Sequence, residues 1–217
     1  MAWRARALPG RRRDFIGIVS LRAENNKVGR TYRVVPTDTT MNILTEIYRS
    51  DDVNFNGKID PRDAVRAVIL RGQNLLMVYS SKVGDYKFPG GGVNVGETHE
   101  HALAREVLEE CGATLLGVDG EMGVIIEYDH AKESDFDVFK MTSSYYYCQV
   151  GDGFLSQTLD EYEHALGFQP VWINVREAIE ANKSLLSLNK PPKWLRREIF
   201  ALDYIKRTII DVDGNTP

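Results

Sequence analysis

The sequence has 217 residues, of which 43% are hydrophobic, and this length and composition predict one globular domain with extensions. No apolar run approaches the roughly 20 residues that a membrane-spanning helix needs, so we expect no integral membrane protein and no membrane partner. The two cysteines, Cys111 and Cys148, form neither a CxxC pair nor a disulfide framework, and we expect a reducing, cytoplasmic location.

The net charge of −4 is unevenly distributed along the chain. Residues 1–40 carry nine Arg and Lys against three Asp and Glu, whereas the remainder carries 18 against 28. A nucleic-acid-binding body is usually basic, so the acidic main part argues against nucleic acid as a partner. It favours an enzyme that acts on a small molecule.

Residues 1–40 are predicted to be a basic, disordered N-terminal extension, because five arginines fall within residues 1–13 without apolar periodicity. The same segment is compatible with a nucleic-acid-binding arm, with a transit peptide, or with a chain whose natural start is Met41. Residues 41–61 form a lead-in segment in front of the main domain.

Residues 52–63 imitate a calcium-binding loop, with oxygen-bearing side chains at loop positions 1, 3, 5, 9 and 12 and a glycine at position 6. The last position is Asp63 rather than a bidentate glutamate. The alternating β-branched residues that follow replace the required exit helix. We therefore interpret this segment as turns that lead into a strand.

The main domain has a regular pattern from Ala64 onward. Strands are predicted at residues 64–70, 74–79, 122–128, 143–150 and 170–174, and helices at 99–111, 175–183 and 192–209. Thr98 can cap the first helix, and Gly112 suits the position after its end. This order of strands and helices predicts an α/β fold with a mixed central β-sheet covered on both faces.

Residues 91–113 read GGVNVGETHEHALAREVLEECGA. This segment resembles the Nudix box, G-x5-E-x7-R-E-U-x-E-E-x-G-U, in which U is a bulky aliphatic residue. The matching positions are Gly91, Glu97, Arg105, Glu106, Val107, Glu109, Glu110 and Gly112. Ala113 stands where a larger apolar residue is usual, which affects packing rather than ligands.

The spacing of the glutamates points to a metal site independently of the resemblance. Glu106, Glu109 and Glu110 lie at i, i+3 and i+4, so their carboxylates share one helix face and repel one another. A hard divalent cation would convert that repulsion into affinity. A solvated acidic face, partly offset by Arg105, is the alternative. The glycine-rich loop and Glu97, both in register with the helix, favour the metal site.

The resemblance implies a Nudix-type α/β/α sandwich over residues 62–217, with the box helix on one face and the C-terminal helix included. It implies a hydrolase that uses Mg²⁺, or Mn²⁺ as a substitute, to direct water onto a phosphoanhydride bond of a nucleoside diphosphate linked to another group. The implied phosphate and metal loop is Gly90 and Gly91, and Glu97 and Arg105 would orient the ligand carboxylates. The implied metal ligands are the Gly90 carbonyl, Glu106, Glu109 and Glu110.

Many members of the family add an acidic residue from a later loop as a base or further ligand. The best candidate here is Glu163, in the acidic stretch ahead of residues 170–174, although that stretch is also compatible with an ordinary surface loop. Glu127 is a weaker candidate. Lys82 and Lys87 flank the loop before the box and are either phosphate contacts or ordinary exposed lysines.

The competing function is a non-catalytic Nudix-like module that senses a nucleotide. The intact set of box glutamates favours the enzyme. In both cases the expected partner is a small-molecule nucleotide, and a homodimer is left open. The residues that select a substrate lie on variable loops, so the sequence does not specify which nucleotide it is.

Overall fold

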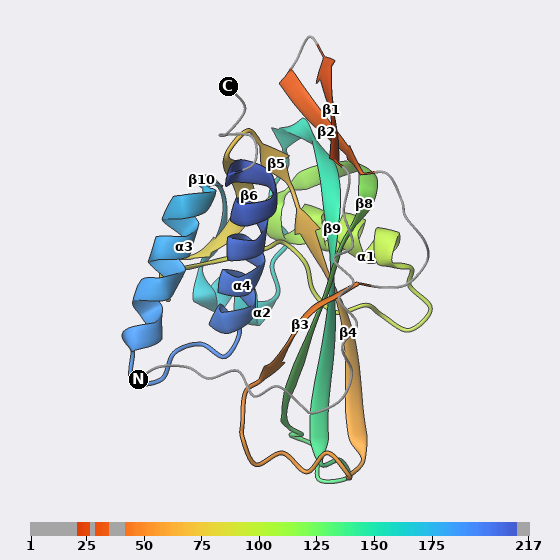
Figure 1. Ribbon diagram of the computed structural model, residues 1–217, viewed down its shortest axis with the longest axis vertical. Helices are drawn as coiled ribbons and strands as arrows, with labels where there is room; N and C mark the ends of the chain where they lie inside the picture. Colours follow the sequence, from red (N-terminus) through yellow and green to blue (C-terminus); the bar gives the residue numbers. More distant parts are fainter. Residues whose placement is uncertain (1–20, 27–28, 35–41, 212–217) are drawn as a thin grey trace.

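The computed structural model describes residues 21–26, 29–34 and 42–211. Figure 1 shows the arrangement of the elements. The strands are β1 (Leu21–Asn26), β2 (Gly29–Val34), β3 (Ile43–Tyr48), β4 (Ile59–Val68), β5 (Leu70–Arg71), β6 (Asn74–Ser80), β7 (Asp85–Lys87), β8 (Ala113–His130), β9 (Val138–Phe154) and β10 (Phe168–Asn174). The helices are α1 (His99–Cys111), α2 (Glu161–Leu166), α3 (Val175–Ser184) and α4 (Leu195–Ile205), with a 3-10 turn at Leu185–Ser187 and a π-helical turn at Lys206–Ile210.

Two four-stranded sheets form the centre of the domain. One has the order β3-β8-β9-β4, with β3 parallel to β8, β4 parallel to β9, and β8 antiparallel to β9. The other is antiparallel, with the order β10-β6-β5 and with β7 paired to β6. The prediction of a mixed central sheet is therefore confirmed, and a second, antiparallel sheet lies beside it.

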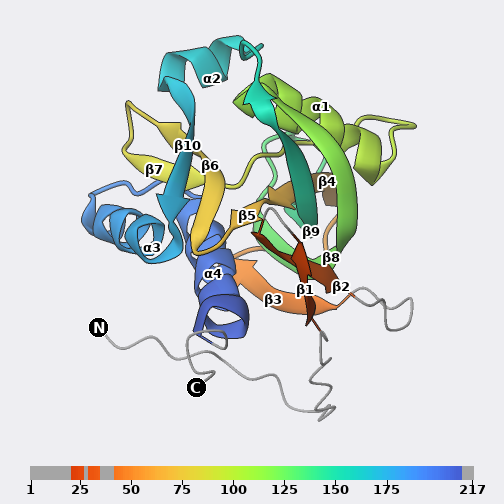
Figure 2. The same cartoon turned by 90° about the horizontal axis from the view of Figure 1, so that it is seen from above.

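Alternation along the strands builds one hydrophobic core on each face. On β6, Leu76 and Val78 pack in a core with α1, whereas Leu75 and Met77 pack in a core with α3 and α4. This period of two is what a strand buried on both faces requires. Helix α1 therefore covers one side and helices α3 and α4 cover the other, as Figure 2 shows. The expected α/β/α layering, with the box helix on one face, is confirmed.

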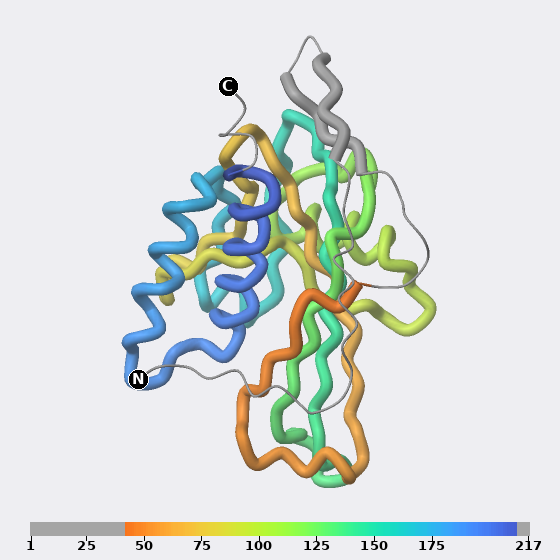
Figure 3. Tube along the Cα trace, viewed as in Figure 1, coloured from red at the N-terminus to blue at the C-terminus, as the bar shows by residue number. Residues whose placement is uncertain are grey.

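Strands β8 and β9 are much longer than the sequence predicted, at 18 and 17 residues. Their pairing contains several register shifts, two of which lie at Gly120 and Gly123. Both glycines have positive φ, which L side chains rarely adopt. The far ends of β8, β9, β3 and β4 project beyond the helices in Figure 3.

The N-terminal and lead-in segments contain more strand than predicted. Within residues 1–40, β1 and β2 pair as an antiparallel hairpin, and the remaining residues of this segment lie outside the described ones. The lead-in segment includes β3 and the start of β4. Residues 52–58 form turns and irregular backbone that lead into β4, to which residues 59–63 already belong, as interpreted from the sequence. None of the described helices is long and apolar enough to cross a membrane.

Candidate active site

Helix α1 begins and ends where the sequence predicted. The Thr98 side chain accepts a hydrogen bond from the backbone N–H of His101 at 3.2 Å, and Gly112 ends the helix in the left-handed conformation with φ of 67°. A methyl group at Gly112 would lie 2.0 Å from the carbonyl oxygen of Leu155, so close approach also requires glycine there. These boundaries fix which helix face each box glutamate occupies.

Three carboxylates converge at the buried end of α1. Glu106 and Glu110 are 7% and 6% exposed, and Glu163 comes from the start of α2. One potential ligand oxygen of each residue lies within 4.8 Å of the others. Across residues 42–211, this is the one such grouping of three acidic, histidine or cysteine side chains. We refer to Glu106, Glu110 and Glu163 as the carboxylate cluster.

The chain between β9 and α2 runs along the C-terminal end of α1, which brings Glu163 into the cluster. The backbone N–H of Leu155 donates to the Gly112 carbonyl at 2.7 Å, and that of Thr158 donates to the Glu109 carbonyl at 2.9 Å. The Glu163 carboxylate then accepts a hydrogen bond from the backbone N–H at the N-cap of α2 at 2.9 Å, within a reciprocal capping box.

The cluster holds three carboxylates that are withdrawn from water, and too little positive charge lies beside them to balance their negative charge. Desolvation raises the pKa of Glu110 to about 8, and it also raises the pKa values of Glu106 and Glu163. Each carboxylate accepts one orienting hydrogen bond, and its other oxygen accepts none from the described residues. Oxygen ligands with excess negative charge are the donor set that Mg²⁺ and Mn²⁺ prefer, so the residues fit a hard divalent cation.

The loop before α1 is pressed against β4 and against the cluster. The backbone N–H of Gly90 donates to Glu110 Oε2 at 2.7 Å, and the Gly91 carbonyl accepts from the Val65 N–H at 3.0 Å. A methyl group at Gly90, whose φ is 141°, would lie 2.1 Å from the Val65 carbonyl oxygen. A methyl group at Gly91 would lie 2.3 Å from Glu106 Oε1. The backbone therefore requires glycine at Gly90, whereas a side chain at Gly91 would displace the Glu106 carboxylate.

Arg105 links the loop to the helix glutamates. Its Nε and Nη2 donate to the two carboxylate oxygens of Glu97, each at 2.9 Å. Its Nη1 donates to Glu106 at 2.7 Å and to Glu109 at 3.2 Å. The guanidinium lowers the pKa of Glu97 to about 2. Arg105 therefore contacts Glu106 from a position outside the cluster, where it can serve the orienting role that the resemblance to the Nudix box implied.

The NUDIX domain family model matches residues 60–194 of this sequence. The chain belongs to the NUDIX family. An RNA pyrophosphohydrolase from Sulfurovum sp. (strain NBC37-1) is 43% identical over 54 residues, which is 25% of this chain. The match spans 34% of that relative's length.

Solved structures of NUDIX proteins also match this chain at low sequence identity. A NUDIX hydrolase from Nitrosomonas europaea is 23% identical, with a TM-score of 0.45, over 65% of this chain and 90% of that one. A MutT NUDIX hydrolase from Burkholderia pseudomallei is 20% identical, with a TM-score of 0.46, over 67% of this chain and 98% of that one.

Glu109 and the Gly90 carbonyl, which were also predicted as metal ligands, have different surroundings from the residues of the carboxylate cluster. The Glu109 side chain is 39% exposed, pairs with Arg105 and stands outside the cluster. The Gly90 carbonyl accepts a hydrogen bond from Nη1 of Arg66 on β4. A carbonyl oxygen has two lone pairs, so one acceptor position remains. The ligand roles of Glu109 and Gly90 stay predictions.

The other residues that the sequence offered as site candidates have surroundings of their own. Glu127 is fully buried and pairs with Arg49 and Arg197, so it holds the fold together and stands outside the cluster. Lys82 is exposed. Lys87 is largely buried, its Nζ lies 3.8 Å from the centre of the Phe168 ring, and its pKa is lowered by desolvation although Glu110 opposes this.

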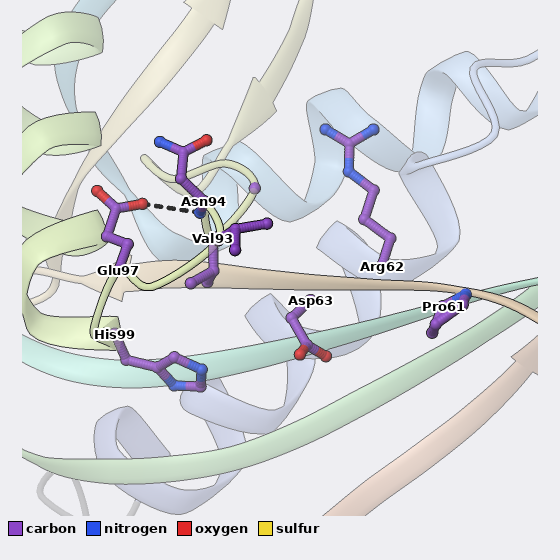
Figure 4. A pocket seen from close by; sticks show the side chains of 9 residues that line it. Pro61, Arg62, Asp63, Val93, Asn94, Glu97 and His99 are labelled. Carbon is purple, nitrogen blue, oxygen red and sulfur yellow. Dashed lines mark hydrogen bonds between the residues drawn. The ribbon is translucent and has the colours of Figure 1, made fainter.

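A pocket of about 610 Å³ borders the loop between β7 and α1 (residues 88–98), which we call the Nudix loop. It lies between the beginning of β4 and the start of α1, and Figure 4 shows its lining side chains. The backbone N–H of Asn94 donates a hydrogen bond of 2.9 Å to Glu97 there, and Arg62 extends from β4 near Gly92. The sequence did not reveal this pocket, because its walls come from separate segments.

Sequence reasoning also missed Arg66. It is the one charged residue in the apolar run 64–70, and its Nε has no hydrogen-bond partner in the described part of the chain. A charge within a strand that is otherwise buried was the available signal, because such a charge needs a partner or a ligand. The structure places it against the Nudix loop through Gly90.

Proposed function

We propose that this protein is a metal-dependent hydrolase that cleaves a phosphoanhydride bond in a nucleoside diphosphate linked to another group. The proposal is carried by the convergence of Glu106, Glu110 and Glu163 within 4.8 Å beside a glycine loop. The metal is Mg²⁺, with Mn²⁺ able to substitute, and the protein acts in the cytoplasm. When bound, the ion supplies charge stabilisation at the phosphate and acidifies the attacking water.

The protein residues would divide the remaining work between them. Glu106 is held by Arg105 and Glu110 by the Gly90 N–H, so both are oriented ligands. Glu163 is held only at its own helix N-terminus, and its pKa is raised. It is therefore suited either to complete the ligand set or to accept a proton from water. Glu109, which is more exposed, would serve a further ion that arrives with the substrate.

The surroundings of the cluster favour an anionic substrate. Arg66 and Lys87 are partly buried cations, and Glu110 acts electrostatically on both. Three carboxylates with two divalent cations would carry a net positive charge, and these two side chains add to it. A diphosphate would neutralise this charge. The pocket beside Gly92 offers space for a group attached to the diphosphate.

The test is hydrolysis of a nucleotide panel with Mg²⁺, comparing the wild type with Glu110→Gln. The panel contains nucleoside triphosphates, nucleotide sugars, ADP-ribose and dinucleoside polyphosphates. It also contains a 5′-triphosphorylated RNA, because the matched relative is named an RNA pyrophosphohydrolase. Coupled pyrophosphatase or phosphatase detects the products.

We expect turnover of at least one substrate and a loss of about a hundredfold in Glu110→Gln. Glu100→Gln is the matched control, because Glu100 is exposed in the first turn of the same helix. Tight nucleotide binding without any turnover would overturn the hydrolase and favour the nucleotide sensor.

A further inference from the structure

A glutamate of α4 holds the Nudix loop on the side opposite Glu110. Glu198 of α4 is fully buried, and its Oε2 accepts a hydrogen bond from the backbone N–H of Phe88 at 3.0 Å. Two residues later, the N–H of Gly90 donates to Glu110 of the cluster. Buried carboxylates from two different helices therefore hold the same short loop, one on each side.

The second oxygen of Glu198 has a separate partner. Oε1 accepts from Nε of Arg197 at 3.1 Å and from Nη2 at 2.7 Å. Nη1 of Arg197 donates to Glu127 of β8 at 2.7 Å, and Glu127 accepts two further hydrogen bonds from Arg49. Glu198 is thus fixed by a buried ionic chain that ties α4 to the long sheet.

A buried row of ion pairs contributes little net free energy to the stability of the fold. Buried ion pairs lose much of their attraction to desolvation, and well-packed apolar residues often serve as well. Hydrogen-bonded buried charges are well suited, however, to fixing one geometry, because each oxygen has a defined donor. Here the defined donor to Oε2 is the N–H of Phe88, in the Lys87–Phe88 peptide, two residues before Gly90.

We infer that Glu198 is a positioning residue for the metal site: through the Phe88 N–H, it sets the place of the Gly90 peptide and hence the affinity of the carboxylate cluster for a divalent cation. The inference rests on the proposed metal-dependent function. Glu198 stands outside the cluster, so it acts through the loop rather than on the ion.

Asn182 of α3 provides a matched control. It is also fully buried, and it also holds the segment before the loop: it accepts from the Tyr86 N–H and donates to the Tyr86 carbonyl, both at 2.8 Å. Its contact is two residues further from Gly90 than that of Glu198. Losing it should loosen the fold without directly releasing the Gly90 peptide.

The experiment compares Glu198→Gln with Asn182→Ser in the full chain without substrate. Electron paramagnetic resonance of free Mn²⁺ gives the dissociation constant, thermal unfolding gives the stability, and the Mg²⁺ dependence of hydrolysis is measured in parallel. A glutamine has the same shape but one acceptor oxygen, so it cannot serve both Arg197 and Phe88.

We expect Glu198→Gln to weaken Mn²⁺ binding about tenfold, as loss of a group that orients ligands does. We expect Asn182→Ser to change the Mn²⁺ dissociation constant by less than about twofold, although it lowers the melting temperature by a similar amount to Glu198→Gln. If Glu198→Gln does not fold, Glu198→Asp keeps the charge for Arg197 but shortens the reach to Phe88, and it should weaken binding in the same direction.

Unchanged Mn²⁺ affinity in the Glu198 variants would overturn the inference while leaving the proposed function intact. Equal weakening in the Asn182 variant would also overturn it, because the effect would then be general loosening. A wild-type chain that binds no Mn²⁺ would overturn the proposed metal site, and the inference with it.

Discussion

The carboxylate oxygens of Glu110 on α1 and Glu163 on α2 lie within 4.8 Å of each other. Helix α2 is only six residues long, and none of its residues is buried. Its position is therefore fixed by its capping box and by the hydrogen bonds of the segment between β9 and α2. Glu163 serves both the cap, through its Oε2, and the cluster. This double use allows its charge to be removed while its helix is kept.

Glu163→Gln should therefore lower activity without unfolding α2. The amide oxygen can still accept from the N-cap backbone N–H, whereas the negative charge in the cluster is lost. We expect turnover to fall by about a hundredfold if Glu163 accepts the proton, and by at least about tenfold if it is only a ligand. Glu161→Gln, an exposed neighbour in the same helical turn, is the control. Equal activity of the two variants would remove Glu163 from the site.

Glu109 and Glu110 should differ in how they affect the binding of the first ion. Glu110 is in the cluster, whereas Glu109 is half-exposed and paired with Arg105. We expect Glu110→Gln to weaken Mn²⁺ binding more than about tenfold, and Glu109→Gln to weaken it less than about threefold, although both reduce turnover. Mn²⁺ titration without substrate separates them. A large loss of affinity in Glu109→Gln would place this residue among the first ligands.

Gly90 and Gly91 should fail in different ways when replaced by alanine. The added methyl at Gly91 meets only the mobile end of the Glu106 side chain, so Gly91→Ala should fold normally but bind Mn²⁺ weakly. At Gly90 the methyl meets the backbone of Val65, and φ is positive. We expect Gly90→Ala to lose about 1–3 kcal/mol of unfolding free energy. Urea unfolding and Mn²⁺ titration test the pair, and wild-type affinity in Gly91→Ala would contradict the geometry.

Local signals explain what the sequence predicted well. Helix 99–111 was placed correctly because Thr98 and Gly112 act within one turn of its ends. The strands that flank it were found from alternation, but β8 also extends through the glycine-containing segment 113–121 and β9 through residues 151–154, and both segments have the composition of turns. Helix α2 was missed although Asp160 and Glu163 have the spacing of a capping box.

Part of the site was predicted. Helical spacing predicted the contact of Arg105 with Glu109, four residues later, and the resemblance to the Nudix box implied that Glu97 and Arg105 orient the ligand carboxylates. Arg66 and Glu198 were not predicted, because each reaches the loop through a tertiary contact that no spacing encodes.

The pairing of Glu97 with Arg105 should make stability depend on pH in the acid range. Arg105 lowers the pKa of Glu97 from its usual 4.5 to about 2. A carboxyl group with a lowered pKa in the fold stabilises it above pH 4.5, and this contribution is lost as the pH falls toward 2. The difference in unfolding free energy between the wild type and Glu97→Gln should therefore be largest near neutral pH.

Urea unfolding of both proteins at pH 7, 5 and 3 measures this difference. We expect it to be nearly constant between the first two values and to shrink clearly at the third, because only there does the unfolded chain bind a proton that the folded one refuses. High salt should reduce it at every pH, since the pair is partly exposed. A difference that stays constant down to pH 3 would show that Glu97 stabilises the loop by shape and neutral hydrogen bonding rather than by its charge.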